Sequence, residues 1–311
     1  MSFSPSRAIL RAAPFLLLPA LLSACSGSSG APARTASPTA SAPAPAAAAQ
    51  ARTAQALAQL ERRFSARLGV YVLDTGTGRA VAYRADERFA FCSTAKALSA
   101  GLLLRRDTGA QLDQDVHYTA TDLVDYSPIT SRHTGTGMRL RDIMAAALQY
   151  SDNTAANLML DQLGGPQQVQ TALRGLHDTT TDVDRTEPTL NDATPGDIRD
   201  TSTPRALGTD LRQFLLGNAL TVSRRQLLTN WLLGNTTGGR YIRAGVPAGW
   251  KVADKTGNGD WGTRNDIAVA WPPSGAPFVI AVLSHRGSAN APSEDALIAD
   301  ATKTAISALH Q

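Results

Sequence analysis

The chain has 311 residues, 43% of them hydrophobic and 18% charged, which excludes a wholly disordered polymer and leaves room for a sizeable folded core. Its formal charge of +4 comes from 30 basic and 26 acidic residues. Four of the arginines and none of the acids lie in residues 1–52, so the remainder is electrically balanced. The positive excess therefore belongs to the N-terminal segment and does not indicate a nucleic-acid partner.

The N-terminal segment has the organisation of an export signal. Arg7 and Arg11 precede an apolar run, Ala12–Ala24, which is shorter than the ~20 residues that span a bilayer as a helix. A secretory signal has a positively charged n-region, a short apolar region and small residues before its cleavage site. This pattern predicts such a signal over residues 1–25. The ending LSAC resembles a bacterial lipobox, which implies lipidation at Cys25. The alternative is an ordinary signal peptide that is cleaved near this position, in which case Cys25 carries no lipid.

Residues 26–52 consist almost entirely of Ser, Gly, Ala, Pro and Thr, with little apolar surface to bury. Such a composition predicts a disordered tether, followed by a single folded domain over residues 53–311. We therefore expect an exported protein, anchored to a membrane through the lipid or released from it. If Cys25 carries a lipid, Cys92 has no partner, and we expect it to be a buried free thiol.

The domain combines strand-like and helical patterns. A helix is predicted over 53–64, a hairpin over 68–84, three further strands over 250–256, 266–271 and 278–284, and a final helix from about Ser293. Between Ser93 and Trp231 the periodic stretches are helical. We therefore expect an α+β fold, in which a five-stranded antiparallel sheet flanked by helices is built from both termini and carries an inserted all-helical subdomain. The site should lie in the cleft between the two.

Lysine is rare in this chain, and one of its four lysines follows a serine by three positions, at Ser93 and Lys96. On a helix these two side chains share a face, so the amine can activate the hydroxyl as a nucleophile. Taken alone the pair is weak, because a capping serine and a solvated lysine give the same pattern. Two further motifs follow it. Ser151-Asp152-Asn153 interrupts a helical pattern and, taken alone, could be only a helix cap. Lys255-Thr256-Gly257 lies on a predicted strand, where Lys255 could equally be a solvent-facing lysine beside a turn glycine.

Residues 182–200 contain two prolines and too few apolar residues for a periodic face. A loop of this length inside a compact domain is usually functional or disordered. Its charges favour order, because Arg185 and Asp200 can close its neck as an ion pair. We therefore expect an ordered loop with a function.

From about Thr53 to its end, the chain resembles a class A serine β-lactamase. The resemblance is carried in order and spacing by residues 91–96 (FCSTAK), 126–128 (YSP), 151–153 (SDN), 185–191 (RTEPTLN) and 255–257 (KTG). It implies the sheet-plus-helices fold, hydrolysis of penicillins or cephalosporins through a serine acyl-enzyme, and resistance to these antibiotics.

The resemblance also implies roles for individual residues. Ser93 is the nucleophile, with Lys96, or Glu187 acting through water, as the base that takes its proton. The backbone N–H groups of Ser93 and Asn258 form the oxyanion hole. Ser151, backed by Lys255, relays a proton to the lactam nitrogen. The residues expected to bind water or substrate are Asn153, Asn191, Lys255, Thr256, Gly257, Asn258, Arg264 and Tyr118.

Within this set, Glu187 and Asn191 hold the deacylating water, Asn153 binds the acylamide side chain, and Tyr118 forms a wall of the cleft. Arg264 binds the substrate carboxylate together with Thr256. In some members of the family that arginine comes from the segment matching 240–243, but the aligned position is Tyr241, and we expect Arg240 and Arg243 to lie in a solvated turn. Gly259 stands where some members carry a disulfide partner for Cys92.

No cofactor or metal is expected, since the histidines lack metal-ligand spacing, and we expect a monomer. Two alternatives stay open. A D-Ala-D-Ala carboxypeptidase-like penicillin-binding protein shares the first three motifs, but it would not need the carboxylate of Glu187. A non-hydrolytic β-lactam sensor would need a transmembrane signalling segment.

Overall fold

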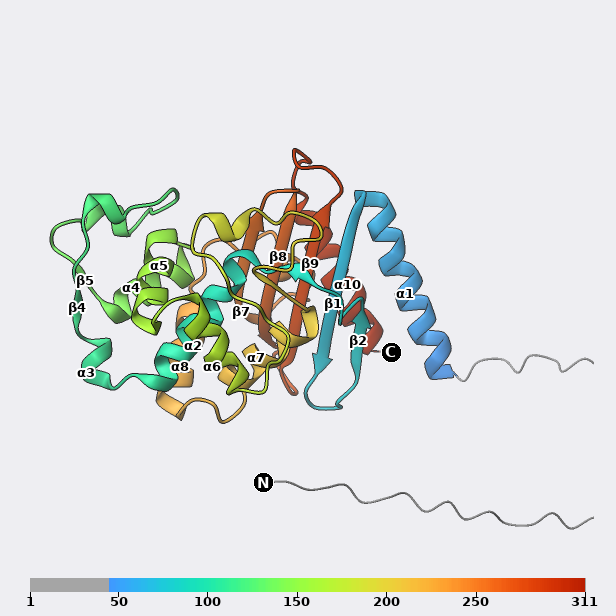
Figure 1. Cartoon of the computed structure of the whole chain (residues 1–311). Helices are drawn as coiled ribbons and strands as arrows, with labels where there is room; N and C mark the ends of the chain where they lie inside the picture. The colour runs from blue at the N-terminus through green and yellow to red at the C-terminus, as the bar shows by residue number, and fades with distance from the viewer. Residues whose placement is uncertain (1–44, 311) are drawn as a thin grey trace, which may run out of the picture. The chain divides into compact units, whose positions relative to one another are not determined.

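The computed structural model of the chain describes residues 45–310. The expected signal segment, Cys25 and residues 26–44 of the expected tether lie outside the described residues. The described chain is built on a five-stranded antiparallel sheet, as predicted (Figure 1). In spatial order its strands are β2 (Ala80–Tyr83), β1 (Ala66–Asp74), β9 (Phe278–Arg286), β8 (Thr263–Trp271) and β7 (Lys251–Gly259).

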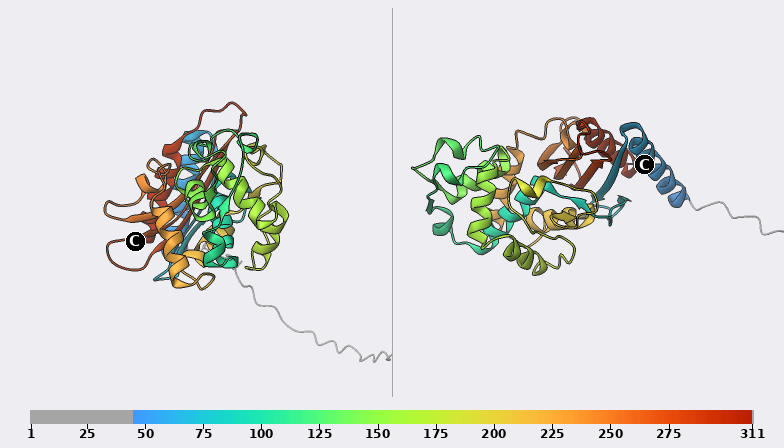
Figure 2. Two further views of the ribbon diagram at one scale, coloured as in Figure 1. Left: turned by 90° about the vertical axis from the view of Figure 1, so that its left-hand side faces the viewer. Right: turned by 45° about the horizontal axis from the view of Figure 1, so that its top comes forward.

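The sheet is buried on both faces because the inner strands carry apolar residues on each side. In β9, Ile280 and Val282 face one hydrophobic cluster, whereas Ala281 and Leu283 face the other. A strand buried on both faces shows a continuous apolar run, which is the pattern of β9 in the sequence. The first cluster lies under α1 (Pro45–Phe64), α9 (Ile242–Gly245) and α10 (Asp295–Leu309). Helices from both ends of the described chain therefore pack on one face (Figures 1 and 2).

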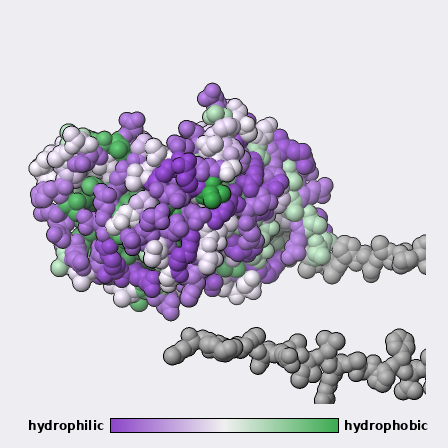
Figure 3. Space-filling model, viewed as in Figure 1, coloured by the Kyte–Doolittle hydropathy of each residue, from purple (hydrophilic) through white to green (hydrophobic). Residues whose placement is uncertain are grey.

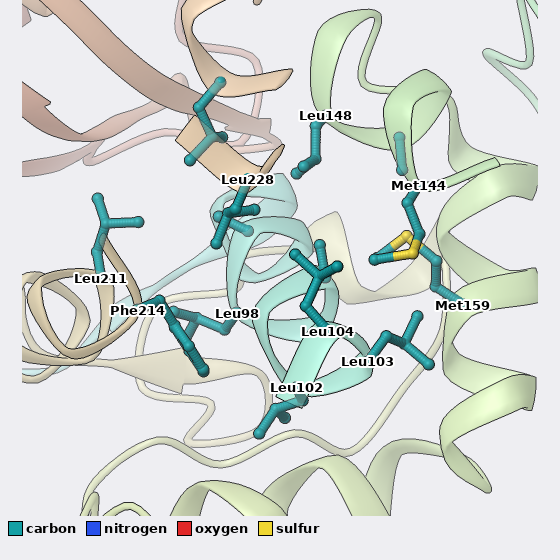
Figure 4. Close-up of a cluster of buried hydrophobic side chains, with 14 of the residues drawn as sticks. Leu98, Leu102, Leu103, Leu104, Met144, Leu148, Met159, Leu211, Phe214 and Leu228 are labelled. Atoms are coloured by element: carbon teal, nitrogen blue, oxygen red, sulfur yellow. The ribbon is translucent and has the colours of Figure 1, made fainter. Parts of the chain in front are cut away.

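The other face of the sheet carries the inserted helical part. Helix α2 (Ala95–Arg106) lies at its centre, and the side chains of Leu98, Leu103 and Leu104 are buried among leucines, methionines and Phe214 of the surrounding helices (Figure 4). The neighbouring helices are α3 (Gly109–Leu112), α4 (Leu140–Gln149), α5 (Asn153–Leu163), α6 (Pro166–Arg174), α7 (Pro204–Leu215) and α8 (Val222–Leu233). Because α2 is enclosed on several sides, its first turn is held rigidly.

Two expectations about this architecture are corrected. The inserted part is not purely helical, since β4 (Asp115–Val116) pairs with β5 (Met138–Arg139), and β6 (Thr201–Ser202) pairs with β3 (Phe89–Ala90). Strands of two residues are too short to show an alternating pattern in the sequence.

The first helix also begins earlier than expected, at Pro45, so residues 45–52 of the expected tether are helical. Alanine has the highest helix propensity, and proline is tolerated in the first turn. The composition of this segment therefore permits a helix even though it offers little apolar surface. The final helix begins at Asp295, with Glu294 at its N-cap position.

The surface shown in Figure 3 is mainly hydrophilic, with apolar side chains in small, scattered groups. Within residues 45–310, no helix has both the length and the apolar character that crossing a membrane requires. The same residues contain no cluster of three or more His, Cys, Asp or Glu side chains placed to hold a metal ion.

Candidate active site

The segment around Ser93 is held in place by contacts from the sheet. Ser93 lies in a 3-10 turn, Cys92–Thr94, directly before α2. The side-chain amide of Asn265, on β8, donates to the carbonyl of Ala90 at 2.8 Å and to that of Phe91 at 3.2 Å. Cys92 has a φ of 50°, a left-handed conformation that is uncommon for a residue with a side chain. The position of the Ser93 hydroxyl is thus set by the sheet behind it.

Lys96 links three of the predicted motifs. Its Nζ donates to the Ser151 carbonyl at 2.8 Å and to Asn153 Oδ1 at 2.6 Å, and it lies 2.9 Å from Glu187 Oε1. Burial lowers the pKa of the Lys96 amine, while the charge of Glu187 acts in the opposite direction. The Ser93 hydroxyl donates to the same atom, Glu187 Oε1, at 3.0 Å. Lys96 and Ser93 therefore meet at the carboxylate of Glu187.

The Ser-Asp-Asn turn between α4 and α5 caps a helix and also presents two side chains to the site. The side chain of Asp152 caps α5 by accepting from Ala155 N at 2.9 Å, so the interpretation of this motif as a helix cap is correct for that residue. Ser151 has a φ of 58°, which turns the chain sharply between the two helices. Ser151 and Asn153, on either side of the cap, instead present their side chains to the lysines.

Lys255 brings the sheet into the site. It lies on β7, is fully buried, and donates from Nζ to Ser151 Oγ at 3.0 Å. The interpretation of this residue as a solvent-facing strand lysine is thereby excluded. Burial, with the nearby positive charge of Lys96 as a second cause, lowers the pKa of Lys255 to about 7. Ser151 Oγ thus lies between two lysines, because Lys96 Nζ is 3.4 Å from it.

Two glycines allow β7 to pass close to the serine turn. A Cβ at Gly257 would lie 2.7 Å from the carbonyl oxygen of Phe91, so any side chain there would push the strand away. A Cβ at Gly259 would lie 2.8 Å from Cys92 Sγ and 2.6 Å from the carbonyl oxygen of Asn191. Cys92 is a buried free cysteine, as predicted, and burial raises the pKa of its thiol.

The loop over residues 182–200 is ordered and delivers Glu187 to the lysine. Its neck is closed by the predicted ion pair, with Arg185 Nε 2.6 Å from Asp200 Oδ2. The side-chain amide of Asn191 donates to Glu187 Oε2. The loop is further fixed by Asn157, which accepts from the backbone N–H of Glu187 at 2.8 Å and donates to its carbonyl at 2.9 Å.

Sequence reasoning missed Asn157. It lies one helical turn beyond Asn153 on α5, a spacing at which two side chains share a face. This spacing could have indicated Asn157 in the sequence. Asn153 contacts Lys96, whereas Asn157 holds the loop at Glu187.

Several residues predicted to bind substrate lie around the end of β7. Thr256 Oγ1 is 2.5 Å from Thr237 Oγ1, and Asn258 is exposed at the strand end. Arg264 pairs in register with Asn258 across to β8, and its Nε donates to Asp295 Oδ1 at 3.2 Å. This guanidinium is 19% exposed and also donates, from Nη1, to the carbonyl of Thr263 at 2.7 Å.

The expectation for Arg243 is wrong. Its Nε lies 2.6 Å from Asp254 Oδ1, and the guanidinium also donates to the carbonyls of Leu232 and Leu233. It therefore binds a fully buried carboxylate and the end of α8 instead of lying in a solvated turn, whereas Arg240 is exposed. A buried carboxylate requires such a partner, and the spacing of arginines along the chain does not reveal it.

The expectation for Tyr118 is also wrong. This side chain is 4% exposed, belongs to the hydrophobic cluster around α2, and donates to the carbonyl of Thr130 at 2.8 Å. A phenol can serve as a core residue when its hydroxyl finds a partner. Tyr126 is 61% exposed, and its carbonyl accepts from the N–H of Asn153. It is thus Tyr126 that lies at the rim of this site.

The cavities of the described residues differ greatly in size. One of about 880 Å³ lies between α1, β2 and the end of α10, away from these motifs. Lys96, Glu187 and Arg185 instead line a cavity of about 20 Å³, large enough for one water molecule. The site is therefore identified by the contacts among Ser93, Lys96 and Glu187, because the largest of these cavities lies elsewhere.

Comparisons with known proteins agree with this geometry. A sequence model described as the β-lactamase enzyme family matches residues 52–309. A β-lactamase of Amycolatopsis lactamdurans is 56% identical over 255 residues, which cover 82% of this chain and 84% of that protein. A β-lactamase of Bacillus subtilis is 51% identical over 257 residues, covering 83% of this chain and 84% of that protein.

The solved structures lead to the same family. A class A β-lactamase from Clostridium kluyveri superposes with a TM-score of 0.83 at 47% identity, covering 84% of this chain and all of that one. A halotolerant bacterial β-lactamase gives a TM-score of 0.81 at 48% identity, covering 82% of this chain and 98% of that one. The family model matches nearly all of the described residues, and the similar solved structures include a class A enzyme at 47% identity. The chain therefore belongs to the class A β-lactamases.

Proposed function

We propose that this chain opens the ring of β-lactam antibiotics by hydrolysis, with Ser93 as the nucleophile, and thereby confers resistance to them. One observation carries the proposal. The hydroxyl of Ser93 and the amine of Lys96 both contact Glu187 Oε1, at 3.0 Å and 2.9 Å, in a buried cluster. A serine hydroxyl becomes nucleophilic when a neighbouring group accepts its proton.

Acylation begins with attack of Ser93 Oγ on the lactam carbonyl. Two bases are placed to take the proton. Glu187 Oε1 accepts the Ser93 hydrogen bond directly, and Lys96, with its lowered pKa, shares the same carboxylate atom. The backbone N–H groups of Ser93 and Asn258 then stabilise the oxyanion, an interaction worth about 3–4 kcal/mol per donor.

Ring opening needs a proton on the lactam nitrogen, and Ser151 supplies it. Its Oγ is 3.0 Å from Lys255 Nζ and 3.4 Å from Lys96 Nζ, so the hydroxyl can pass a proton on and recover one from an amine. The close approach of β7 at Gly257 brings Lys255 to this position.

Hydrolysis of the acyl-enzyme requires a base that activates a water molecule, and Glu187 serves this step. Its carboxylate is oriented by Asn191 on Oε2 and by Lys96 on Oε1. A carboxylate with an adjacent amide can hold one water molecule against the acyl carbonyl and remove its proton. This step separates a hydrolase from a penicillin-binding protein, which shares the acylation machinery but retains the acyl group.

The substrate is bound by residues around the end of β7 and the start of α5. Asn153 donates one amide hydrogen to the carbonyl of Asp125, which leaves the second for the acylamide side chain. Thr256 and Arg264 bind the substrate carboxylate, and Tyr126, at the rim, takes the wall role that was expected of Tyr118.

Substitution of the nucleophile tests the proposal. Ser93→Ala should abolish turnover of a chromogenic cephalosporin, whereas Ser131→Ala, at an exposed serine, should leave it unchanged. If the Ser93→Ala protein folds and still turns over the substrate, Ser93 is not the nucleophile. If the native enzyme instead cleaves D-Ala-D-Ala peptides and releases penicillin slowly, the peptidase alternative is favoured.

We further propose that the enzyme is a monomer and is exported with a lipid on Cys25. The LSAC sequence after a short apolar run supports the export and the lipid. Metabolic labelling with a fatty-acid analogue should mark the native protein and not Cys25→Ala. Equal labelling of the two would contradict the anchor. Size-exclusion chromatography with light scattering would report the oligomeric state.

A further inference from the structure

Tyr241 contacts the residue that directly follows the Lys255-Thr256-Gly257 motif. Its hydroxyl donates to Asn258 Oδ1 at 2.8 Å. The tyrosine is buried, with 5% of its surface exposed, whereas the asparagine is exposed at the end of the edge strand β7. The contact thus joins a fixed group inside the protein to a side chain at the rim of the site.

The position of Tyr241 is itself determined by the sheet. Its N–H donates to the carbonyl of Gly238 at 3.1 Å, and the next N–H, that of Ile242, donates to Asp266 Oδ2 at 3.0 Å. Asp266 is fully buried on β8, in register with Thr256 on β7. The backbone that carries the phenol is therefore attached to β8, the strand of Arg264.

The hydrogen bond fixes which end of the Asn258 amide faces outward. Burial raises the pKa of Tyr241, so the phenol is neutral, and in the structure its hydroxyl donates to the amide oxygen. An amide whose oxygen is already accepting presents its NH₂ group, which carries two donors and no acceptor, to the other side. Among residues 45–310 this Nδ2 has no hydrogen-bond partner, and Arg264 lies across the strand pair from Asn258.

We propose that Tyr241 is a positioning residue, which holds the Asn258 amide so that its NH₂ group donates to the carboxylate of the β-lactam beside Arg264. The inference rests on the proposed hydrolysis and assigns Tyr241 and Asn258 a part in selecting anionic substrates. Tyr241 touches no substrate itself and acts only through Asn258.

A double-mutant cycle tests the proposal, with a penicillin and its neutral methyl ester as the two substrates. Tyr241→Phe should raise KM for the penicillin about three- to tenfold, the effect of losing one hydrogen bond, with kcat within about twofold. The methyl ester should be unaffected. In an Asn258→Ala background, Tyr241→Phe should have no further effect, because the group it positions is absent.

Two more variants sharpen the cycle. Asn258→Asp still accepts from Tyr241 but replaces the donors with a negative charge, so KM for the penicillin should rise more than in Asn258→Ala. Tyr83→Phe removes another partly buried phenol bond, to Glu61 at 2.6 Å, far from the site, and should leave both substrates unchanged.

Each other outcome overturns the inference. Equal losses for penicillin and ester in Tyr241→Phe would show a structural role only, as would a loss that adds fully to that of Asn258→Ala. An unchanged KM in a folded Tyr241→Phe enzyme would also contradict it. Failure of the proposed function is distinct, because the native enzyme would then hydrolyse neither substrate.

Discussion

The floor and the rim of the active site are built in different ways. On the floor, Lys96, Glu187 and Lys255 are buried, and each is held by groups from more than one element. On the rim, Tyr126 and Asn258 are exposed, and Arg264 is partly exposed, with its guanidinium held by Asp295 and by the carbonyl of Thr263. Buried charges must be paired, so the floor tolerates one arrangement. Substitutions on the exposed rim should cost less stability, and we therefore expect the floor to carry the proposed chemistry and the rim to set substrate preference.

The largest expected effect comes from removing a charge on the floor. Lys96→Ala leaves the buried carboxylate of Glu187 without its ion-pair partner. We expect kcat/KM to fall about 10²–10⁴-fold and the free energy of unfolding to fall by about 3–5 kcal/mol, the usual result of breaking a buried pair. Kinetics with a chromogenic cephalosporin and denaturant unfolding measure both. Lys303→Ala, at an exposed lysine, should change neither, and near-native activity in Lys96→Ala would contradict the role of the floor.

The next effect tests how closely β7 must approach the serine turn. In Gly257→Ala the new Cβ would meet the carbonyl oxygen of Phe91 at 2.7 Å, so the strand must move. A shift of about 1 Å in a catalytic group can cost about 10²-fold in rate, and we expect a loss of that order in kcat. The matched control is Gly239→Ala, where a Cβ meets open space. Equal activity in the two variants would show that the approach is not required.

The pH dependence of binding tests the electrostatics of the floor. The Lys255 amine has a pKa lowered to about 7, so it is charged below that pH and neutral above it. If the charged amine attracts the anionic substrate, kcat/KM should decline as the pH rises through about 7. In Lys255→Arg the decline should move to higher pH, because a guanidinium stays charged. If the native enzyme and Lys255→Arg give the same pH profile, the decline is not caused by titration of Lys255.

The smallest effect is expected on the rim. Tyr126→Ala removes an exposed aromatic ring whose contact with substrate is worth about 0.5–1.5 kcal/mol, so KM should rise up to about tenfold with kcat nearly unchanged. The free energy of unfolding should change by less than about 0.5 kcal/mol. Tyr118→Phe, by contrast, removes a core hydrogen bond and should lower stability without changing KM. A large fall in kcat in Tyr126→Ala would show that the rim takes part in the chemistry.

The sheet was predictable from local patterns, whereas the convergence of the floor residues was implied by the resemblance to a class A β-lactamase. The strands of the sheet are apolar runs, and the Ser-x-x-Lys, Ser-Asp-Asn and Lys-Thr-Gly motifs lie on elements whose type their neighbours determine. The ion pair of Arg185 with Asp200 was predictable because a long loop rich in charge needs a closed neck.

The rim was predicted less well because its residues are selected by tertiary packing. Tyr118 and Tyr126 are eight positions apart in an irregular segment, and no periodicity says which is buried. The buried partner of Arg243 lies on another element and becomes visible only when β7 and α9 pack together. The same holds for the contact of Tyr241 with Asn258.

The fate of the acyl-enzyme tests the central claim most directly, because we propose that Glu187 makes this floor hydrolytic. Intact-protein mass spectrometry should show that Glu187→Ala, mixed with a penicillin, accumulates one covalent adduct that persists for hours. Asp192→Asn, in the same loop, should release the adduct as the native enzyme does. Rapid loss of the adduct from Glu187→Ala would contradict the account, since another group would then have to activate the deacylating water.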